Sequence, residues 1–331
     1  MRVLELDSPA PVEGRPLVLR DRARPRPGHG QLLVRVLACA VCHTDLHLVE
    51  GDLRMAVYPR VPGHQVAGEV IEAGEGVEGW RPGDRVGVPW LHRTCGMCEF
   101  CRRGEENLCP EAVFTGLHVD GGFADALLAE AAFALHMPAE WLPEKAAPLL
   151  CAGIIGYRAL RIADLAPGER LGLVGFGASA HLALQVAAGW DCPVLVFTRS
   201  EAHRRHALAL GAVWAGTIDD IPPVRLDRAI IFAPAGELVP ATLALLRPGG
   251  TLAINAIHMS SIPSMPYERI YGERTLRSVA NATYRDGVDF LALARERDLR
   301  VSTQAYPLEQ ANQALADLKA SRLEGAAVLI P

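Results

Sequence analysis

Four cysteines within one short segment constrain the fold of this part of the chain more than any other feature. They are Cys95, Cys98, Cys101 and Cys109. Four thiolates so close in sequence can surround one tetrahedral metal ion, and sulfur ligands favour zinc or iron. A site with four protein ligands has no open position for a substrate. We therefore expect a structural zinc lobe at 91–112 and a reaction site elsewhere.

A second group of potential metal ligands is dispersed along the chain. Cys42 begins the run Cys42-His43-Thr44-Asp45, His64 follows a glycine, and Cys151 ends an apolar run. Two cysteines and one histidine form a zinc site with one position open to water or substrate. A zinc ion there stabilises negative charge on an alcohol oxygen, so that hydride can leave the neighbouring carbon near neutral pH. The sequence thus predicts two zinc ions per chain, one catalytic and one structural.

Length and composition limit the class of protein. A chain of 331 residues, half of them hydrophobic, is long for one core and favours two domains. The net charge is −5 and no run of lysine or arginine is present, which argues against nucleic acid as a partner. Charges interrupt every apolar stretch near the amino terminus, so we expect no membrane span, no signal peptide and a cytoplasmic protein with reduced thiols.

The texture of the sequence changes near residue 150. Before it, short apolar runs are broken by Gly and Pro, which is typical of a mostly antiparallel β domain. After it, strand-like and helix-like segments alternate, which indicates an α/β fold with a doubly wound parallel sheet. The expected parts are a first domain at 1–150, a second at 151–286, and a tail at 287–331 that returns to the first domain.

A glycine-rich turn opens the second part. Gly175-Phe176-Gly177-Ala178-Ser179-Ala180 follows a predicted strand at 171–174 and begins a predicted helix at 180–188. Gly175 and Gly177 allow a tight bend and close approach of the backbone to a pyrophosphate, while Ala180 packs the helix on the sheet. This context favours dinucleotide binding over an ordinary turn.

The end of the next predicted strand, 194–197, bears on the choice of cofactor. Many NAD-binding sites carry an acidic residue there, but this chain has Thr198-Arg199-Ser200. Arg199 is suited to a 2′-phosphate, with His203 and Arg204 one helical turn further on. The alternative is a solvated basic start of a helix, in which Glu201 reaches the ribose. The sequence therefore gives NADP(H) a modest advantage over NAD(H).

Taken together, these motifs resemble those of the zinc-dependent medium-chain alcohol dehydrogenases, over essentially the whole chain. The resemblance is strongest to the tetrameric microbial and yeast-type members. It rests on Cys42-His43-Thr44-Asp45 with His47, Gly51-Asp52, Gly63-His64, Trp90, the four-cysteine lobe, Leu150-Cys151-Ala152-Gly153 and the glycine-rich turn. It implies a GroES-like catalytic domain, a Rossmann cofactor domain and a homotetramer or homodimer.

The resemblance also implies how the reaction residues act. Cys42, His64 and Cys151 would hold the catalytic zinc. Thr44 would accept the hydroxyl proton and His47 would pass it toward solvent. Asp45 would bond the second ring nitrogen of His64 and fix its tautomer.

Three further residues match cofactor or substrate positions of the family. His43 would contact a cofactor phosphate, and Leu53 and Trp90 would line a pocket for small or thin apolar substrates. Trp90 is equally consistent with an ordinary core position. The chain departs from the family at Gln65, where a glutamate is usual, and at Ala326, where an arginine often contacts the pyrophosphate.

These features favour an alcohol dehydrogenase that interconverts small or medium alcohols and aldehydes or ketones. An alternative within the enzymes is an NADPH-dependent aldehyde reductase of the cinnamyl type, and cofactor preference separates the two. A non-catalytic zinc-stabilised interaction protein is a third possibility. It gives no reason for an open metal site beside a nucleotide turn.

Overall fold

The computed structural model describes residues 1–53, 57–323 and 325–331. Contacts divide the chain into two compact units. Unit 1 contains Met1–Ile154, Asn281–Ala292 and Val301–Pro331, and unit 2 contains Ile155–Ala280 and Leu293–Arg300. Within the described ranges, no helix combines the length and apolar character that a membrane crossing requires.

The segment Leu293–Arg300 belongs to unit 2, whereas the sequence placed all of 287–331 with the first domain. The reason is a set of hydrogen bonds to the end of one unit 2 helix. Arg300 and Gln185 bond reciprocally, with the Arg300 amide 2.8 Å from Gln185 Oε1 and Gln185 Nε2 3.0 Å from the Arg300 carbonyl. Arg297 Nη1 donates to the Gly189 carbonyl at 2.5 Å. The composition of the segment gave no sign of these bonds.

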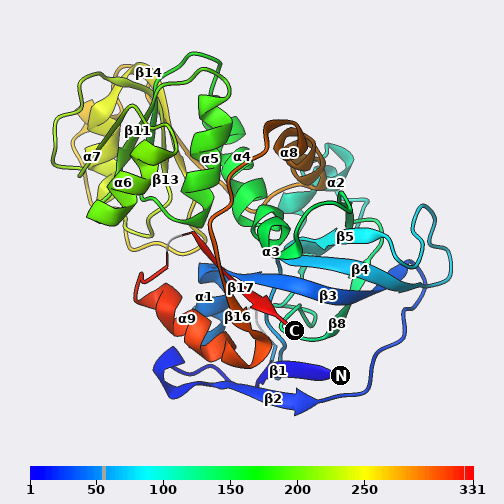
Figure 1. The fold of residues 1–331 in the computed structure, drawn as a ribbon. Helices are drawn as coiled ribbons and strands as arrows, with labels where there is room; N and C mark the ends of the chain where they lie inside the picture. Colours follow the sequence, from blue (N-terminus) through cyan, green and yellow to red (C-terminus); the bar gives the residue numbers. More distant parts are fainter. Residues whose placement is uncertain (54–56, 324) are drawn as a thin grey trace. The chain divides into compact units, whose positions relative to one another are not determined.

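Unit 1 is built on a seven-stranded sheet (Figure 1). Its order is β16-β17-β3-β4-β5-β9, with β8 also paired to β3, and only β16 and β17 run parallel. The strands are β3 (Gln31–Val41), β4 (Val66–Ala73), β5 (Arg85–Val88), β8 (Ala126–Glu130), β9 (Leu135–His136), β16 (Thr303–Pro307) and β17 (Ala326–Ile330). This is the mostly antiparallel sheet that the sequence predicted.

Strand β3 is the centre of this sheet, and most of its residues are buried, because it pairs with three other strands. Unit 1 also contains two small antiparallel pairs of strands. They are β1 (Arg2–Leu6) with β2 (Leu17–Asp21) and β6 (Leu91–Arg93) with β7 (Val113–Phe114). The helices are α1 (His43–Glu50), α2 (Glu99–Arg102), α3 (Pro143–Ala146) and α9 (Ala311–Lys319), with 3-10 turns η1 (Val12–Gly14), η2 (Glu106–Leu108), η3 (Ala147–Leu150) and η5 (Leu308–Gln310).

Unit 2 contains a six-stranded parallel sheet of order β12-β11-β10-β13-β14-β15. Its strands are β10 (Leu171–Val174), β11 (Val194–Phe197), β12 (Trp214–Gly216), β13 (Leu226–Ile231), β14 (Leu246–Ile254) and β15 (Thr275–Ser278). The strand order reverses between β10 and β13. Ligands of such sheets bind beyond the carboxyl ends of the strands at this reversal.

Helices pack against the strands of unit 2 (Figure 1). They are α5 (Ala178–Ala188), α6 (Glu201–Ala209) and α7 (Leu238–Leu245), with a 3-10 turn η4 (Tyr267–Arg269). Helices α4 (Ala152–Ile162) and α8 (Tyr284–Arg297) each contain residues of both units. The first two predicted strands match β10 and β11, and the parallel strand order that reverses between β10 and β13 confirms the predicted doubly wound sheet.

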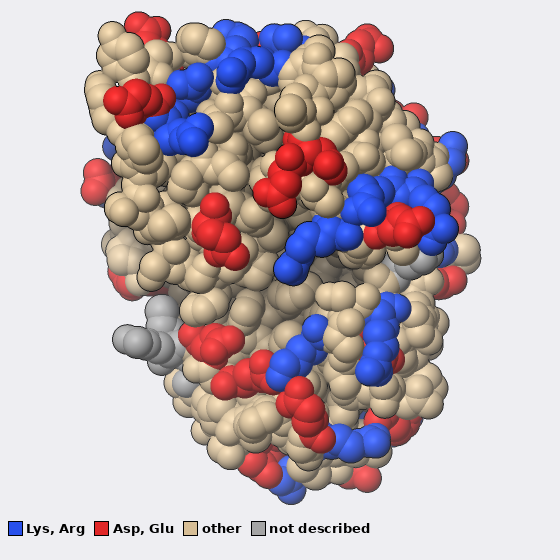
Figure 2. Space-filling model, turned by 90° about the vertical axis from the view of Figure 1, so that its left-hand side faces the viewer, with Lys and Arg blue, Asp and Glu red and all other residues tan. Residues whose placement is uncertain are grey.

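Charged side chains of both signs are interspersed on the face drawn in Figure 2. The sequence has 33 Lys and Arg against 38 Asp and Glu, and many of these side chains form ion pairs. Arg2, for example, contacts Asp125 at 2.8 Å and Glu309 at 2.6 Å. Exposed pairs of this kind contribute about 1 kcal/mol or less each to the free energy of unfolding, so they are a minor part of the stability of the fold.

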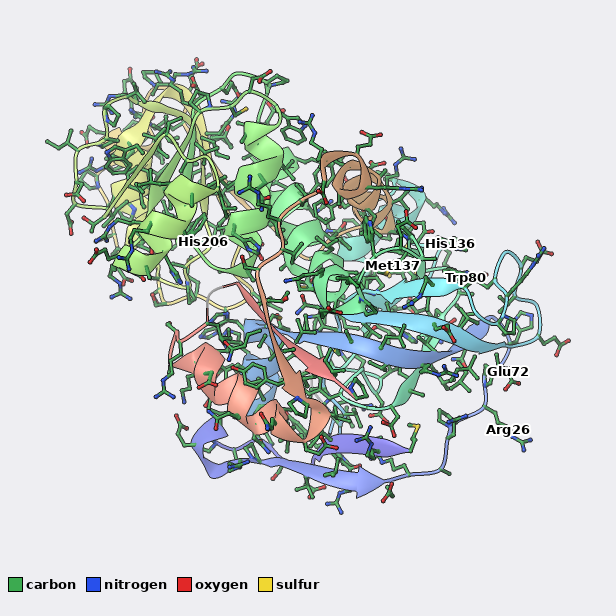
Figure 3. All side chains as sticks on the ribbon, viewed as in Figure 1. Arg26, Glu72, Trp80, His136, Met137 and His206 are labelled. Atoms are coloured by element: carbon green, nitrogen blue, oxygen red, sulfur yellow. The ribbon has the colours of Figure 1, made fainter. Side chains whose placement is uncertain are left out.

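Two histidines on neighbouring helices pack inside unit 2. His181 on α5 is buried, and His206 on α6, labelled in Figure 3, lies 6.2 Å away between ring centroids. Burial, reinforced by His206, lowers the pKa of His181 to about 4. His181 is therefore neutral near pH 7 and acts as a packing residue between α5 and α6.

Asp227 at the start of β13 ties three segments of unit 2 together. Its carboxylate accepts from the Arg170 amide at 2.9 Å, from Arg170 Nε at 2.7 Å and from Arg247 Nε. The hydrogen bond from the Arg170 side chain lowers the pKa of Asp227 strongly, although burial opposes it. The residue is 7% exposed, so these bonds are partly shielded from solvent.

We expect Asp227→Asn to lower the free energy of unfolding by about 1.5–3 kcal/mol, the range for hydrogen bonds to charged groups. The folded pKa is depressed, so this contribution is complete above the ordinary aspartate pKa of about 4 and declines as the pH falls below it. Urea unfolding at pH 7 and pH 3 measures both effects. A wild type and variant that differ equally at the two pH values would contradict this assignment.

Candidate active site and metal centres

The three ligands expected at the open site lie together in unit 1. Cys42 follows β3 and caps α1, and His64 lies just before β4. Cys39 pairs with Val66 across these antiparallel strands, so the end of β3 and the start of β4 meet at one edge of the sheet. Cys42 Sγ is 3.3 Å from His64 Nε2. Cys151 follows η3, and the ligand atoms of the three residues all lie within 4.8 Å of one another.

Asp45 holds this arrangement in place. Its carboxylate accepts from the Cys42 amide at 3.0 Å and from the Gly63 amide at 3.1 Å, and it lies 3.1 Å from His64 Nδ1. Asp45 and His64 are each 1% exposed. A proton on Nδ1 bonded to this carboxylate leaves Nε2 free to bind a metal ion, which is the usual arrangement at zinc sites.

The charges of the three ligands are coupled. A hydrogen bond from Cys151 and the nearby His64 lower the pKa of Cys42 well below its usual value despite burial, and the same bond raises the pKa of Cys151. Burial alone lowers the pKa of His64, but Asp45 and Cys42 outweigh it and raise that pKa to about 10. A metal ion entering this set displaces protons from its ligands, so its affinity falls as the pH falls.

Helix α1 carries the other predicted reaction residues. The Thr44 amide donates to Cys42 Sγ at 3.3 Å, so Thr44 lies directly beside the ligand set. His47 lies one turn further along α1, where its Nδ1 is 2.8 Å from Asp52 Oδ2. Asp52 was not among the predicted reaction residues. His43 begins α1 and is exposed.

Gln65 and the predicted pocket residues border the same region. Gln65 is 1% exposed, its Oε1 accepts from the Ala152 amide at 3.5 Å, and its Nε2 has no partner among the described residues. The Trp90 ring meets the His64 ring edge-on, with centroids 4.6 Å apart. Leu53 packs against the core of unit 1, half-buried. The tryptophan therefore contacts a predicted zinc ligand as well as the core.

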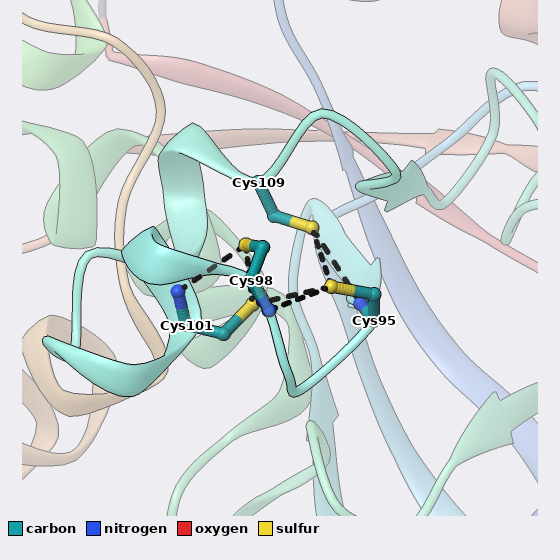
Figure 4. A group of neighbouring side chains, drawn as sticks. All are labelled: Cys95, Cys98, Cys101 and Cys109. Carbon is teal, nitrogen blue, oxygen red and sulfur yellow. Dashed lines mark hydrogen bonds between the residues drawn. The ribbon is translucent and has the colours of Figure 1, made fainter.

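The four cysteines of the lobe converge around one point (Figure 4). Sulfur–sulfur distances are 4.0 Å for Cys95–Cys101, 3.5 Å for Cys98–Cys101 and 3.6 Å for Cys109–Cys95. Backbone amides point at the sulfurs, as the Cys98 amide does toward Cys95 Sγ at 3.3 Å. Such amides lower the pKa of Cys95 to about 7.

Both clusters have the chemistry of zinc sites. Four sulfurs about 2.3 Å from a tetrahedral zinc ion lie about 3.8 Å from each other, close to the spacing in the lobe. The trio of two cysteines and one histidine supplies three protein ligands and leaves a fourth position open. The residues present therefore fit a closed structural site and an open catalytic site.

The glycine-rich turn lies in unit 2 at the reversal of the sheet. Gly175 has a φ of +89°, and a Cβ there would come within 2.9 Å of the Ala233 amide. Gly177 caps α5, and a Cβ on it would meet no atom within 4 Å. Gly177 therefore leaves space beside the start of α5, the kind of helix N-terminus at which anions bind. Ala180 is fully buried, as its predicted packing function requires.

The residues after β11 differ in their exposure and in the hydrogen bonds that they form. The Thr198 amide bonds the Gly216 carbonyl at 2.7 Å, and Ser200 caps α6 by accepting from the His203 amide at 3.3 Å. Arg199 is exposed. Arg204 Nη1 donates to the carbonyls of residues 198 and 199, each at 2.9 Å, so this guanidinium supports the loop. Glu201 pairs with Arg205 at 3.9 Å.

Asn281 lies near the open site but was not predicted as a site residue. Asn281 Oδ1 accepts from Trp90 Nε1 at 3.1 Å, although 191 residues separate the two in sequence. The only local signal was the run Thr283-Tyr284-Arg285-Asp286, which has the form of a helix cap. It could have placed the start of α8 but not a contact with Trp90.

Comparisons with known proteins show the family to which the chain is related. A family model described as the alcohol dehydrogenase GroES-like domain matches residues 28–139. A probable alcohol dehydrogenase, AdhA of Mycobacterium tuberculosis, is 47% identical over 100% of this chain and 97% of its own length. An alcohol dehydrogenase of Geobacillus stearothermophilus is 32% identical, with 95% of each chain covered.

Solved structures show the same likeness. The alcohol dehydrogenase of Aeropyrum pernix has a TM-score of 0.89 at 30% identity and covers both chains fully. A cinnamyl alcohol dehydrogenase of Sorghum bicolor has a TM-score of 0.91 at 29% identity, covering 99% of this chain and 97% of its own. The chain therefore belongs to the zinc-dependent medium-chain alcohol dehydrogenase family and is an oxidoreductase.

Proposed function

We propose that the chain interconverts small or medium alcohols with aldehydes or ketones, with one catalytic and one structural zinc ion per chain. The convergence of Cys42, His64 and Cys151, with Asp45 behind the imidazole, is the observation that carries this proposal. Zinc in this site supplies a Lewis acid that makes the substrate hydroxyl more acidic. Zinc content per chain, together with rates on a panel of alcohols and aldehydes with both cofactors, tests it.

The proton released from the substrate needs a path through this chain's own residues. Thr44, beside the ligand set, accepts it. His47 lies on the same helix, and a proton on Nδ1 shared with Asp52 leaves Nε2 able to accept another. His47 then passes the proton to solvent. The pH dependence of alcohol oxidation in His47→Gln measures this step, with the largest loss expected at low pH, where hydroxide cannot replace the relay.

For the cofactor, we propose a modest preference for NADP(H) over NAD(H). The Gly175–Gly177 turn and the amides of α5 receive the pyrophosphate, and His43 is the proposed side-chain contact to a cofactor phosphate. Arg199 is exposed after β11 and has the charge for a 2′-phosphate. A zinc-binding dehydrogenase structure from Sinorhizobium meliloti, 26% identical to this chain, is described as bound to NADP.

We expect Thr198→Asp to lower the preference for NADP(H) by at least about tenfold, because the new carboxylate repels a 2′-phosphate and accepts bonds from ribose hydroxyls. A tenfold change corresponds to about 1.4 kcal/mol. The ratio of kcat/KM for the two cofactors measures it, and Glu296→Gln, which changes an exposed side chain on α8, is the control. An unchanged ratio, or a wild type that strongly prefers NAD(H), contradicts the assignment.

Leu53 and Trp90 favour small or thin apolar substrates in this proposal. The alternative, an NADPH-dependent aldehyde reductase of the cinnamyl type, draws support from the Sorghum bicolor structure and from a probable cinnamyl alcohol dehydrogenase of Oryza sativa that is 31% identical to this chain. A higher kcat/KM for cinnamaldehyde with NADPH than for any small alcohol would favour the alternative.

Gln65 differs from the family glutamate and stands next to His64. We propose that its neutral amide only hydrogen-bonds in the site, through Oε1 to the Ala152 amide. Gln65→Glu adds negative charge beside the ligands and reduces the net positive charge of the loaded site. The pH profile of alcohol oxidation is then expected to move to higher pH. A profile that stays in place, or moves to lower pH, contradicts this view of residue 65.

The assembly and location are also proposals. Strand β15 is one of the two edge strands of the unit 2 sheet, and all four of its residues are exposed, as are Tyr267 and Tyr271 shortly before it in the chain. An exposed edge strand is a template for pairing with a second copy, so we propose a homodimer or homotetramer. Sedimentation equilibrium determines which. Eight free cysteines favour a reducing compartment, the cytoplasm, which fractionation of cells would test.

A further inference from the structure

The segment that leads into α8 is hydrogen-bonded to one residue beside each predicted metal centre of unit 1. Asn281 has a left-handed backbone, with a φ of +57°, and its side chain bonds Trp90 Nε1 at 3.1 Å. The Tyr284 amide donates to Glu106 Oε1 at 2.8 Å, and Glu106 precedes Cys109 in the four-cysteine lobe. One short stretch of chain is thus bonded to the lobe and to the tryptophan beside His64.

This stretch is held firmly. Asp286 is fully buried and accepts from the Thr283 amide at 2.9 Å and from the Thr283 hydroxyl at 2.7 Å, while the Asp286 amide donates back to Thr283 Oγ1 at 3.1 Å. This reciprocal cap fixes the start of α8. The backbone that carries Asn281 is therefore held in place, and its side-chain oxygen Oδ1 accepts the bond from Trp90.

The indole of Trp90 is fixed on three sides. Asn281 bonds its N–H, the Phe114 ring stacks on it with centroids 5.0 Å apart, and the His64 ring meets it edge-on at 4.6 Å. His64 is itself held at its far nitrogen by Asp45. A rotation of the indole would therefore change the space beside the open metal position.

We infer that Asn281 is a positioning residue that sets substrate specificity, because its bond to Trp90 fixes the indole beside His64. The inference rests on the proposed function, in which Trp90 borders the substrate. The bond between the Tyr284 amide and Glu106 ties the same segment to the four-cysteine lobe. The lobe therefore helps to hold Asn281, and through it Trp90, in position. Asn281 itself touches neither the metal ligands nor the reacting atoms.

The test compares variants that separate the side-chain bond from the backbone conformation. Asn281→Gly keeps the left-handed backbone and removes the acceptor, whereas Asn281→Asp keeps an acceptor. Ser321→Gly places glycine at another left-handed position of unit 1, with a φ of +53°, and serves as the control. The readouts are the ratio of kcat/KM for benzyl alcohol to that for ethanol, and the near-UV circular dichroism that Trp90→Phe removes from the wild-type spectrum.

We expect Asn281→Gly to change the ratio by about threefold or more and to alter the Trp90 signal, while Asn281→Asp and Ser321→Gly stay within about twofold of wild type. In a Trp90→Phe background, which lacks the indole N–H, Asn281→Gly has no further effect on the ratio. An unchanged ratio, or one that changes equally in that background, overturns the inference. If the wild type oxidises neither alcohol, the proposed function fails, while the spectra still decide whether Asn281 holds Trp90.

Discussion

Replacing Cys42 by serine is expected to reduce kcat/KM for alcohol oxidation by about a thousandfold or more and to leave one zinc ion per chain. Zinc acting as a Lewis acid supplies several kcal/mol of stabilisation, and about 4 kcal/mol corresponds to a thousandfold. Cys42 Sγ lies 3.3 Å from His64 Nε2, and its replacement removes one of the three predicted ligands of the catalytic zinc. Elemental analysis and steady-state kinetics on the same preparation measure both effects.

A matched control comes from a cysteine outside both clusters. Cys192 is buried in unit 2, where its thiol donates to the Ala166 carbonyl at 3.3 Å. Cys192→Ala is expected to keep the wild-type zinc content and activity. Wild-type activity in Cys42→Ser, or the loss of both zinc ions, would contradict the division into two separate sites.

The sequence indicated which cysteines form a cluster, because closely spaced thiols are typical ligands of a metal ion. Four cysteines in one loop segment have few other uses in a chain with reduced thiols, so the spacing alone was enough to group Cys95 with Cys109. Cys42 and Cys151 are different, since nothing local links them. Their convergence was expected from the order of motifs in a family, and in the fold it follows from the adjacent ends of β3 and β4 and the turn η3.

Contacts between distant segments were beyond the reach of the sequence. Asn281 and Trp90 form a hydrogen bond although they are far apart in the sequence. Neither residue type indicates from the sequence which partner it will bond. Arg204 shows a second kind of contact that the sequence did not reveal. Its charge suggested a reinforcing phosphate contact, and its Nη1 also bonds the carbonyls of residues 198 and 199, which only the path of the loop could show.

The exact ends of the helices were also beyond the sequence pattern. Helix α9 begins at Ala311, directly after the 3-10 turn η5. Helix α8 begins at Tyr284, where the buried pair Thr283 and Asp286 caps it. Apolar periodicity locates the middle of a helix, whereas the cap that fixes its first turn depends on a few polar side chains.

Cys98→Ser is expected to empty the four-cysteine site and lower the free energy of unfolding by several kcal/mol, with one zinc ion left per chain. Structural zinc contributes about 10–16 kcal/mol in isolated zinc-finger peptides, an upper limit for a lobe whose folding also draws on the rest of unit 1. Cys98 accepts from the Cys101 amide at 3.5 Å and caps α2, so one substitution removes a ligand and loosens the short helix. Zinc content and urea unfolding measure the change.

The catalytic zinc is expected to stay, because Cys42, His64 and Cys151 are held by β3, β4 and η3 and not by the lobe. Met97→Ala is the matched control, since Met97 lies between two lobe cysteines and is 68% exposed. It should keep both ions and wild-type stability. A Cys98→Ser protein that keeps two zinc ions at full stability would show that the lobe does not use Cys98 as a ligand. One that loses both ions would show that the open site depends on the lobe for its fold.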